Sequence, residues 1–138
     1  MKVKVRAVIM IDGRLVVVRE SRRGGHMHVS LPGGRVKDRE ALLDALRREV
    51  HEETGLDVEV GRLLYVCEVF SVGMQEVNLV FAADPVEPVD SDGLELVDLE
   101  LGMAPELMPP ILGEIAQDAA NDWRQGTRWL GNVRVPTG

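Results

Sequence analysis

The sequence predicts an α/β fold in which a mixed β-sheet lies between helices that cover both of its faces. Three observations indicate this class: strand-like segments come first, a helical segment interrupts them, and a second helical segment follows the last of them. The chain has 138 residues, about the size of one domain, and no internal repeat or long linker divides it. We therefore expect a single domain over residues 1–138.

The N-terminal part is expected to begin with two strands. Apolar segments flank Asp12-Gly13 and predict strands at Val5–Ile11 and Leu15–Arg19. Because Asp-Gly is a favoured two-residue turn, these strands should form a hairpin or follow one another directly. The next stretch, Glu20–Ser30, is polar and contains glycines, which is typical of a surface loop.

The central part is expected to form a helix over Glu40–Glu53. Asp38 is the candidate N-cap residue, and Gly55 supplies the stop after the last turn. The apolar positions that are expected to face the core are spaced by four residues: Leu42, Leu46 and Val50.

The remainder of the chain is expected to form further strands and then a final helix. The predicted strands are Asp57–Val60, Leu63–Phe70, Glu76–Ala82 and Leu94–Leu99. A loop that contains prolines and acidic residues, Asp84–Gly93, precedes the last of these strands. Prolines frame the final helix, which is expected at Ile111–Trp123.

Composition limits the class of protein. Hydrophobic residues make up 45% of the chain and charged residues 28%, which is ordinary for a globular protein and excludes a long disordered tract. The single cysteine, Cys67, excludes an internal disulfide and suits a reducing compartment. No apolar run approaches the ~20 residues of a membrane helix, and the N-terminal charges do not suit a signal peptide. We therefore expect a cytoplasmic protein with no membrane partner.

The charge balance is acidic. The chain carries 16 Lys and Arg against 23 Asp and Glu, a formal net charge of −7. An acidic surface repels phosphate backbones, so binding to duplex nucleic acid is not expected. A polyanionic substrate would need a divalent cation, held by clustered carboxylates, to cancel this repulsion locally.

The predicted helix carries acidic residues where its apolar face ends. At ~100° per residue, Glu49 and Glu53 fall in the direction of the Leu46 stripe, and Glu52 lies about 80° to one side. These carboxylates also lie near the helix C-terminus, where the helix dipole disfavours anions. Partly desolvated like charges are costly there unless a cation pairs with them, and Mg²⁺ prefers such oxygen ligands. The alternative is a solvated acidic patch that pairs with neighbouring arginines.

The spacing of residues around this helix is more specific. Starting at Gly34, five residues lead to Glu40, and seven more lead to the run Arg48-Glu49-Val50-His51-Glu52-Glu53-Thr54-Gly55-Leu56. The segment Gly34–Leu56 resembles the Nudix signature G-x(5)-E-x(7)-R-E-U-x-E-E-x-G-U, where U is a bulky aliphatic residue, at every specified position. A glycine loop, a helix and a glycine stop also follow one another as the signature requires.

The resemblance to the Nudix family implies an α/β/α sandwich and an enzyme. Members hydrolyse the pyrophosphate linkage of a nucleoside diphosphate joined to another group, with Mg²⁺ or Mn²⁺, which neutralises phosphoryl charge and activates the attacking water. The expected substrate is a small molecule related to ADP-ribose, a nucleotide sugar or an NTP. The alternative is a non-catalytic ligand sensor on the same fold. An isoprenoid diphosphate isomerase would need further acid-base residues in a longer chain.

The resemblance also implies roles for individual residues. The expected catalytic residues are Glu49, Glu52, Glu53 and Arg48. The three glutamates are expected to ligate the metal together with the backbone carbonyl of Gly33. Arg48 is expected to orient a neighbouring glutamate, and Glu40 to hold the loop against the start of the helix.

The residue that accepts the proton from water is left open. It is one of the helix glutamates or, as in some family members, a glutamate outside the signature. The candidates outside it are Glu76, Glu87, Glu95 and Glu100.

Substrate contacts are expected mainly from arginines near the glycine loop. Arg19 and Arg35 are the leading candidates for binding phosphates, with Arg22, Arg23 and Arg39 nearby, and the alternative is a solvated basic loop. A platform for the nucleobase would come from one of five aromatic residues that could instead lie in the core: Tyr65, Phe70, Phe81, Trp123 and Trp129. The segment Trp123–Gly131 could pack across a homodimer interface or close over the base.

Overall fold

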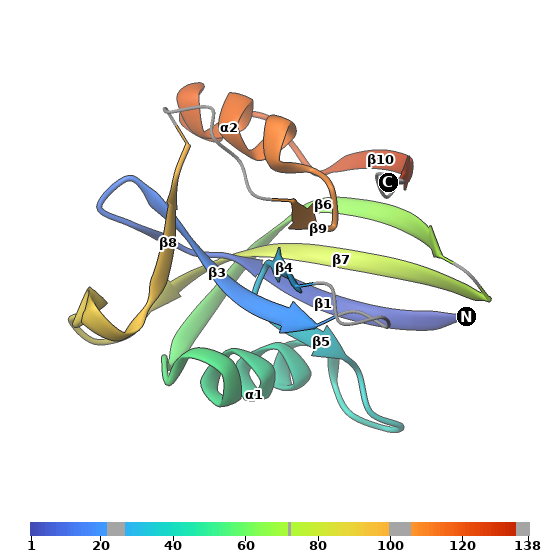
Figure 1. The fold of residues 1–138 in the computed structure, drawn as a ribbon, viewed down its shortest axis with the longest axis horizontal. Coiled ribbons are helices and arrows are strands. Elements are labelled where there is room, and N and C mark those ends of the chain that lie inside the picture. Colours follow the sequence, from blue (N-terminus) through green and yellow to red (C-terminus); the bar gives the residue numbers. More distant parts are fainter. Residues whose placement is uncertain (22–26, 72, 100–105, 135–138) are drawn as a thin grey trace.

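The computed structural model describes residues 1–21, 27–71, 73–99 and 106–134. Two α-helices in this part of the chain, α1 (Leu42–Thr54) and α2 (Leu112–Ala120), lie on opposite sides of the β-structure (Figure 1). None of its helices is long and apolar enough to cross a membrane. The other elements are β1 (Lys2–Val8), β2 (Met10–Ile11), β3 (Arg14–Ser21), β4 (Met27–Ser30), β5 (Gly33–Arg35), β6 (Val58–Ser71), β7 (Met74–Pro85), the 3-10 turn η1 (Ser91–Gly93), β8 (Glu95–Asp98), β9 (Leu107–Met108) and β10 (Arg128–Arg134).

The strands form two sheets. The first has the order β10-β6-β7-β1-β5, and the second has the order β2-β3-β4-β9, with β8 also paired to β3. Both sheets are mixed: β1 runs parallel to β7, β10 to β6 and β4 to β9, whereas the other pairs are antiparallel. The predicted α/β class with helices on both sides is confirmed, but two sheets take the place of the single sheet expected.

The division between the sheets begins inside the first predicted strand, Val5–Ile11. Its pairing changes at Ile9: β1 pairs with β5 and β7 in the first sheet, whereas β2 pairs with β3 in the second. Asp12 and Gly13 have φ values of 51° and 76° in the β2–β3 turn. The hairpin expected at this Asp-Gly pair therefore forms, with the left-handed backbone that such turns require.

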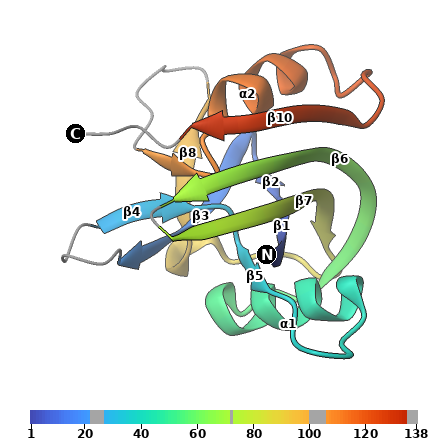
Figure 2. The ribbon, with the colours of Figure 1, turned by 90° about the vertical axis from the view of Figure 1, so that its right-hand side faces the viewer.

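Each helix covers its own hydrophobic core (Figure 2). The α1 core joins Ala45, Leu46 and Val50 to apolar residues of β1, whereas the α2 core joins Ile115 to residues of β3, β4 and β6. Leu46 and Val50 therefore face the core as predicted. Leu42 is 40% exposed, so its predicted place in the core is wrong. The buried stripe is centred on Ala45 and Leu46, and α1 only begins at Leu42.

The ends of α1 depend on different interactions. Gly55 ends the helix as predicted: it adopts a φ of 77°, and its N–H donates to the carbonyl of His51 at 2.9 Å. The start differs from the prediction, because Ala41 rather than Asp38 occupies the N-cap position. Arg39, two residues before Ala41, has a φ of 63°, which is not a right-handed helical value. The chain has therefore not yet entered the helix at Glu40.

Several strands were not expected from the pattern. The predicted loop Glu20–Ser30 is wrong at both ends, because β3 extends to Ser21 and β4 begins at Met27. The predicted strands Asp57–Val60 and Leu63–Phe70 form one strand, β6, with irregular register against β7. The segment Trp123–Gly131 leads into β10, which pairs with β6. β4 is short, and both β4 and β10 have a partner strand far away in sequence, β9 and β6, so local alternation does not reveal these two strands.

Candidate active site

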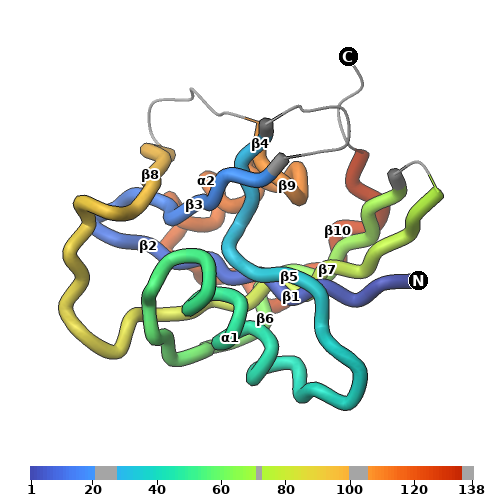
Figure 3. Tube along the Cα trace, turned by 60° about the horizontal axis from the view of Figure 1, so that its bottom comes forward, coloured from blue at the N-terminus to red at the C-terminus, as the bar shows by residue number. Residues whose placement is uncertain are grey.

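The last turns of α1 lie against β5 (Figure 3). The backbone N–H of Gly33 donates a hydrogen bond to Glu53 Oε1 at 2.9 Å. A Cβ atom at Gly34 would lie 2.7 Å from the Glu49 carboxyl carbon, and one at Gly33 would lie 2.0 Å from the carbonyl oxygen of Val5. Gly33 also has a φ of 142°, a conformation that other residues rarely adopt. Gly34 therefore allows the backbone to approach the Glu49 carboxylate, and Gly33 allows β5 to approach the backbone of β1.

Arg48 pairs with three carboxylates around the helix. Its guanidinium forms a two-pronged ion pair with Glu40, Nε to Oε2 at 2.8 Å and Nη2 to Oε1 at 3.0 Å. Its Nη1 also lies 3.0 Å from Glu49 Oε1 and 3.4 Å from Glu52 Oε2. The hydrogen bond from Arg48, helped by the Lys37 N–H, lowers the pKa of Glu40 to about 2. Arg48 thus ties the start of the signature to the helix and orients Glu49.

Glu53 is the glutamate at the end of α1 that does not pair with Arg48. Glu53 is exposed as a residue, but its carboxylate is partly desolvated beside β5, where it accepts the hydrogen bond from the Gly33 N–H. This desolvation raises the pKa of Glu53 to about 7, although the Gly33 N–H opposes the shift. The charges of Glu20 and Glu49 raise the pKa of Glu53 further, and Arg6 lowers it. A cation bound here would relieve both the desolvation and the repulsion.

The donor atoms at the end of α1 suit a divalent cation. Carboxylate oxygens of Glu49, Glu52 and Glu53 are the ligand type that Mg²⁺ and Mn²⁺ prefer. Within the part of the chain that the structure describes, however, no three His, Cys, Asp or Glu side chains are already gathered around one point. Two of the three glutamates instead pair with Arg48, so they must turn toward a cation to ligate it together. The three glutamates therefore fit a divalent cation, because they offer carboxylate oxygens and lie close together on one helix.

A buried cluster next to the glycine strand was not predicted from the sequence. Arg6 of β1 is only 4% exposed, and its Nη1 donates to the carbonyl of Leu31 at 2.9 Å and lies 3.5 Å from that of Gly33. The same Nη1 is 3.6 Å from Glu20, which also accepts a hydrogen bond from Ser30 at 2.9 Å. The signal in the sequence was a lone arginine inside an apolar strand, but only the strand pairing shows what it contacts.

The two arginines expected to bind phosphates lie in different places. Arg19 forms an ion pair with Glu95 at 2.6 Å, and both residues line a pocket of about 290 Å³ that Glu53 also lines. The side chain of Arg35 is exposed on β5, and its carbonyl accepts a hydrogen bond from Arg48 at 3.4 Å. The structure therefore brings Arg19 together with Glu53 and places Arg35 beside Arg48. Arg22 and Arg23 lie outside the described residues.

The candidate glutamates outside the signature are also separated by the fold. Glu76 pairs with Lys4 at 3.2 Å on the first sheet, and Glu87 is exposed after β7. Glu95 lines the same pocket as Glu53. Glu100 falls outside the described residues.

The five candidate aromatic residues fall into two groups. Tyr65 is buried, and Phe81 and Trp123 pack against the hydrophobic cores. Phe70 is 49% exposed and Trp129 is 62% exposed. The first group serves packing, and only the second group presents rings to solvent.

Comparisons with known proteins match this arrangement. The model of the NUDIX domain matches residues 1–120. The 8-oxo-dGDP phosphatase NUDT18 of Danio rerio is 37% identical over 70 residues, which are 51% of this chain and 21% of that protein. The chain thus spans about a fifth of the length of this curated relative.

Solved structures show the same fold. A NUDIX hydrolase from Nitrosomonas europaea aligns with a TM-score of 0.72 at 22% identity, over 88% of this chain and 89% of that one. A UDP-X diphosphatase aligns with a TM-score of 0.70 at 21% identity, over 91% of this chain and 66% of that one. The family model covers most of the chain and includes the whole signature Gly34–Leu56. The chain therefore belongs to the NUDIX family, the family of the Nudix hydrolases.

Proposed function

We propose that this chain hydrolyses the pyrophosphate linkage of a small nucleoside diphosphate derivative with the help of Mg²⁺ or Mn²⁺. The observation that carries the proposal is the uncompensated negative charge at the end of α1. Glu49 and Glu53 lie against the two glycines of β5, and a single arginine, Arg48, is shared among Glu40, Glu49 and Glu52. An excess of carboxylates beside closely approaching backbone suits a cation that is shared with substrate phosphates.

The roles follow from these contacts. Glu49, Glu52 and Glu53 would hold the cation, and the carbonyl of Gly33 is the proposed backbone ligand. The bound cation would neutralise phosphoryl charge and lower the pKa of the attacking water. Arg48 orients Glu49 by an ion pair at 3.0 Å. Glu53 is held by the Gly33 N–H, with one carboxylate oxygen left to accept a proton or to bind the cation.

The class of substrate is proposed from the relatives and from the charge of the site. The names of two relatives refer to 8-oxo-dGDP and to UDP-X, both nucleoside diphosphates or derivatives of them. A bound cation would offset the repulsion between a polyanion of this kind and a chain with a net charge of −7.

The test is a substrate panel in ¹⁸O-labelled water. The protein is incubated with Mg²⁺ and ADP-ribose, dinucleotides, nucleotide sugars, NTPs or 8-oxo-dGDP, and the products are identified by mass spectrometry. We expect cleavage of the diphosphate linkage of at least one compound, with ¹⁸O on the phosphorus that water attacks. The same panel with EDTA should give no product.

Two results would overturn the proposal. Tight binding of a panel compound without turnover would indicate a ligand sensor instead of an enzyme. If the folded protein binds Mg²⁺ but turns over none of these compounds, the metal site does not serve hydrolysis of these substrates.

A further inference from the structure

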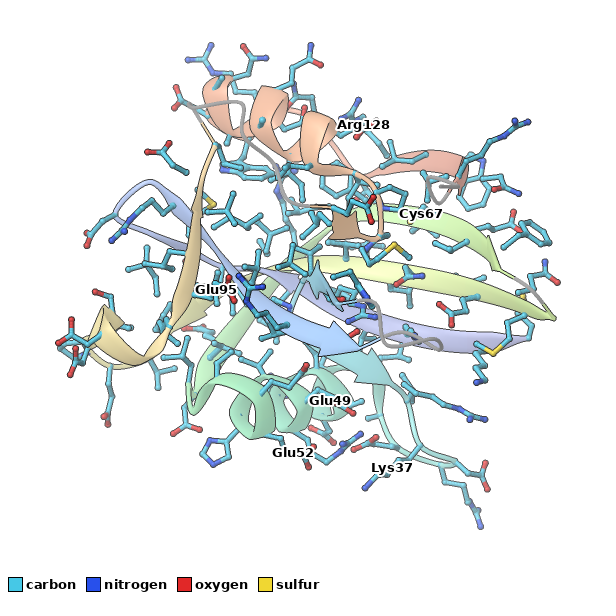
Figure 4. All side chains as sticks on the ribbon, viewed as in Figure 1. Lys37, Glu49, Glu52, Cys67, Glu95 and Arg128 are labelled. Atoms are coloured by element: carbon cyan, nitrogen blue, oxygen red, sulfur yellow. The ribbon has the colours of Figure 1, made fainter. Side chains whose placement is uncertain are left out.

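The pocket beside Glu53 is closed on one side by an ion pair. It lies between β3, the end of α1 and the segment Gly93–Glu95, and its volume is about 290 Å³. Arg19 Nη2 of β3 lies 2.6 Å from Glu95 Oε1 of β8, and both residues line the pocket. The label of Glu95 in Figure 4 shows its place on β8, on the side of the molecule where α1 ends. A cation and an anion thus lie at the pocket edge, near the carboxylates of α1.

The ion pair can exchange partners at low cost. The Arg19 side chain is 62% exposed and that of Glu95 is 35% exposed, so water already solvates both charges. Exposed pairs of this kind contribute little to stability, because screening and side-chain entropy offset the attraction. A phosphate offers the same planar guanidinium two oxygen acceptors in a matching geometry. Arg19 can therefore leave Glu95 for a phosphate group.

The lining of the pocket favours a sugar over a nucleobase. None of the eight described residues that line it is aromatic, so it offers no ring on which a base could stack. Its volume is at the lower end of small-molecule sites, which run from about 300 to 1,000 Å³. Once released, the Glu95 carboxylate can accept hydrogen bonds from hydroxyl groups. The apolar walls include Val17 and Leu94, which suit the faces of a sugar ring.

We infer that this pocket binds a phosphorylated sugar, and that Arg19 exchanges Glu95 for a phosphate oxygen when the ligand enters. Arg19 is then the phosphate-binding residue, and Glu95 both holds it in the free protein and accepts hydrogen bonds from the sugar. The inference rests on the proposed function for the identity of the ligand, because the sugar would be the group joined to the nucleoside diphosphate.

The experiment measures binding alone, by calorimetry in EDTA, with ADP-ribose and ADP as probes. ADP-ribose differs from ADP by its terminal ribose, whose attachment also removes the second ionisation of the β-phosphate, so tighter binding of ADP-ribose despite its smaller charge reports the contribution of the sugar. We expect ADP-ribose to bind about fivefold more tightly than ADP, a ratio that corresponds to about 1 kcal/mol. Because no metal is present, this result does not depend on whether the protein is a hydrolase.

Three variants separate the exchange from a structural role. Arg19→Gln should weaken both ligands about tenfold, because a charge-assisted hydrogen bond to phosphate is lost. Glu95→Gln should tighten ADP about two- to fivefold, because Arg19 is released from its ion pair. It should also reduce the preference for ADP-ribose. The double variant should bind ADP like Arg19→Gln alone, because Glu95 has no partner to release.

The matched controls are Arg47→Gln and Glu59→Gln, which remove the same charges at exposed positions on α1 and β6. Both should bind the probes like the unchanged protein. The inference is overturned if Glu95→Gln weakens ADP or leaves it unchanged, or if ADP-ribose and ADP bind equally well. A hydrolase that turns over ADP-ribose while these binding results fail would retain the proposed function and lose only this site.

Discussion

Two arginine-centred clusters, one near each helix, differ in their balance of charge. In the cluster near α2, Asp118 accepts hydrogen bonds from the Tyr65 hydroxyl at 2.5 Å and from Arg128 Nη2 at 2.7 Å. Arg128 also lies 5.6 Å from the centroid of the Tyr65 ring. One cation here meets one buried carboxylate, and the hydroxyl completes the set. This cluster ties α2, β6 and β10 together.

In the cluster near α1, one cation meets several carboxylates. Arg48 pairs with Glu40, Glu49 and Glu52, while Glu53 forms no ion pair within the part of the chain that the structure describes. Figure 4 labels Glu49 and Arg128 on opposite sides of the molecule. The balanced charges near α2 thus hold three elements together, whereas the excess of carboxylates near α1 is the feature from which we propose a cation site.

The largest effect is expected from Glu53→Gln. The substitution removes the charge that would hold the cation, while the side-chain carbonyl can still accept the hydrogen bond from the Gly33 N–H. We expect kcat to fall about 100-fold or more, the scale seen when an electrostatic contact to the reaction is lost. Steady-state kinetics on the best panel substrate measures it. Glu59→Gln, an exposed carboxylate on β6, is the control and should keep its rate.

A change in the balanced cluster should affect stability instead. Asp118 is 3% exposed, and Asp118→Asn removes the charge that pairs with Arg128 and weakens the bond from Tyr65. We expect the free energy of unfolding to fall by about 2–4 kcal/mol, because charged partners are left poorly satisfied. Urea denaturation measures this change. The folded variant should keep its kcat.

The control for that variant lies four residues further along the chain. Asp122 pairs with Arg124 at 3.9 Å, and both side chains are more than 80% exposed. Asp122→Asn therefore makes the same chemical change in water and should alter the free energy of unfolding very little. Equal losses in the two variants would contradict the structural role assigned to Asp118.

Stabilisation by Mg²⁺ provides a further test of the difference between the two clusters. Mg²⁺ that binds only the folded chain should raise its stability by about 2.7 kcal/mol at a concentration 100 times the dissociation constant. We expect an upward shift of the melting temperature in the unchanged protein and in Asp118→Asn, and a much smaller one in Glu53→Gln. Thermal scans with and without Mg²⁺ provide the test. A full shift in Glu53→Gln would place the cation elsewhere.

Most of the candidate site could be predicted because its residues are close in sequence. The spacing from Gly34 to Leu56 identifies one helix and its glycines, and helical geometry alone brings Glu49 and Glu53 to the same side. Arg6 and Glu20 could not be assigned in this way. Arg6 lies on β1 and Glu20 on β3, which belong to different sheets, so their contact depends on how the two sheets pack together and not on a local pattern.

Long-range contacts also explain where the elements differ from the predictions. Asp38 satisfies the local preference for an N-cap, but Glu40 binds Arg48 and the Lys37 N–H before α1 begins. The chain therefore enters the helix later than the pattern indicates. β10 has arginines only at its two ends and a glycine and an asparagine in its middle, so it lacks a clear alternation, and it forms by pairing with the edge of β6.

The smallest effect is expected from Glu40→Gln, which removes the charge of the Arg48 partner that lies before α1. Arg48 lowers the pKa of Glu40 from an ordinary value near 4.5 to about 2, so the folded protein binds this proton more weakly than the unfolded chain. The ion pair therefore contributes stability above pH 4.5, and the contribution is lost as the pH falls through about 2.

Glu40→Gln should lower the melting temperature slightly at pH 7, and the difference from the unchanged protein should shrink between pH 4.5 and 2. A difference that stays constant over this range would show that the charge of Glu40 is not what holds the loop to the helix, and Glu59→Gln provides the baseline for an exposed carboxylate. Because the Glu40 pair is balanced, whereas Glu53 forms no ion pair among the described residues, we expect a small stability effect at Glu40 beside a large kinetic effect at Glu53.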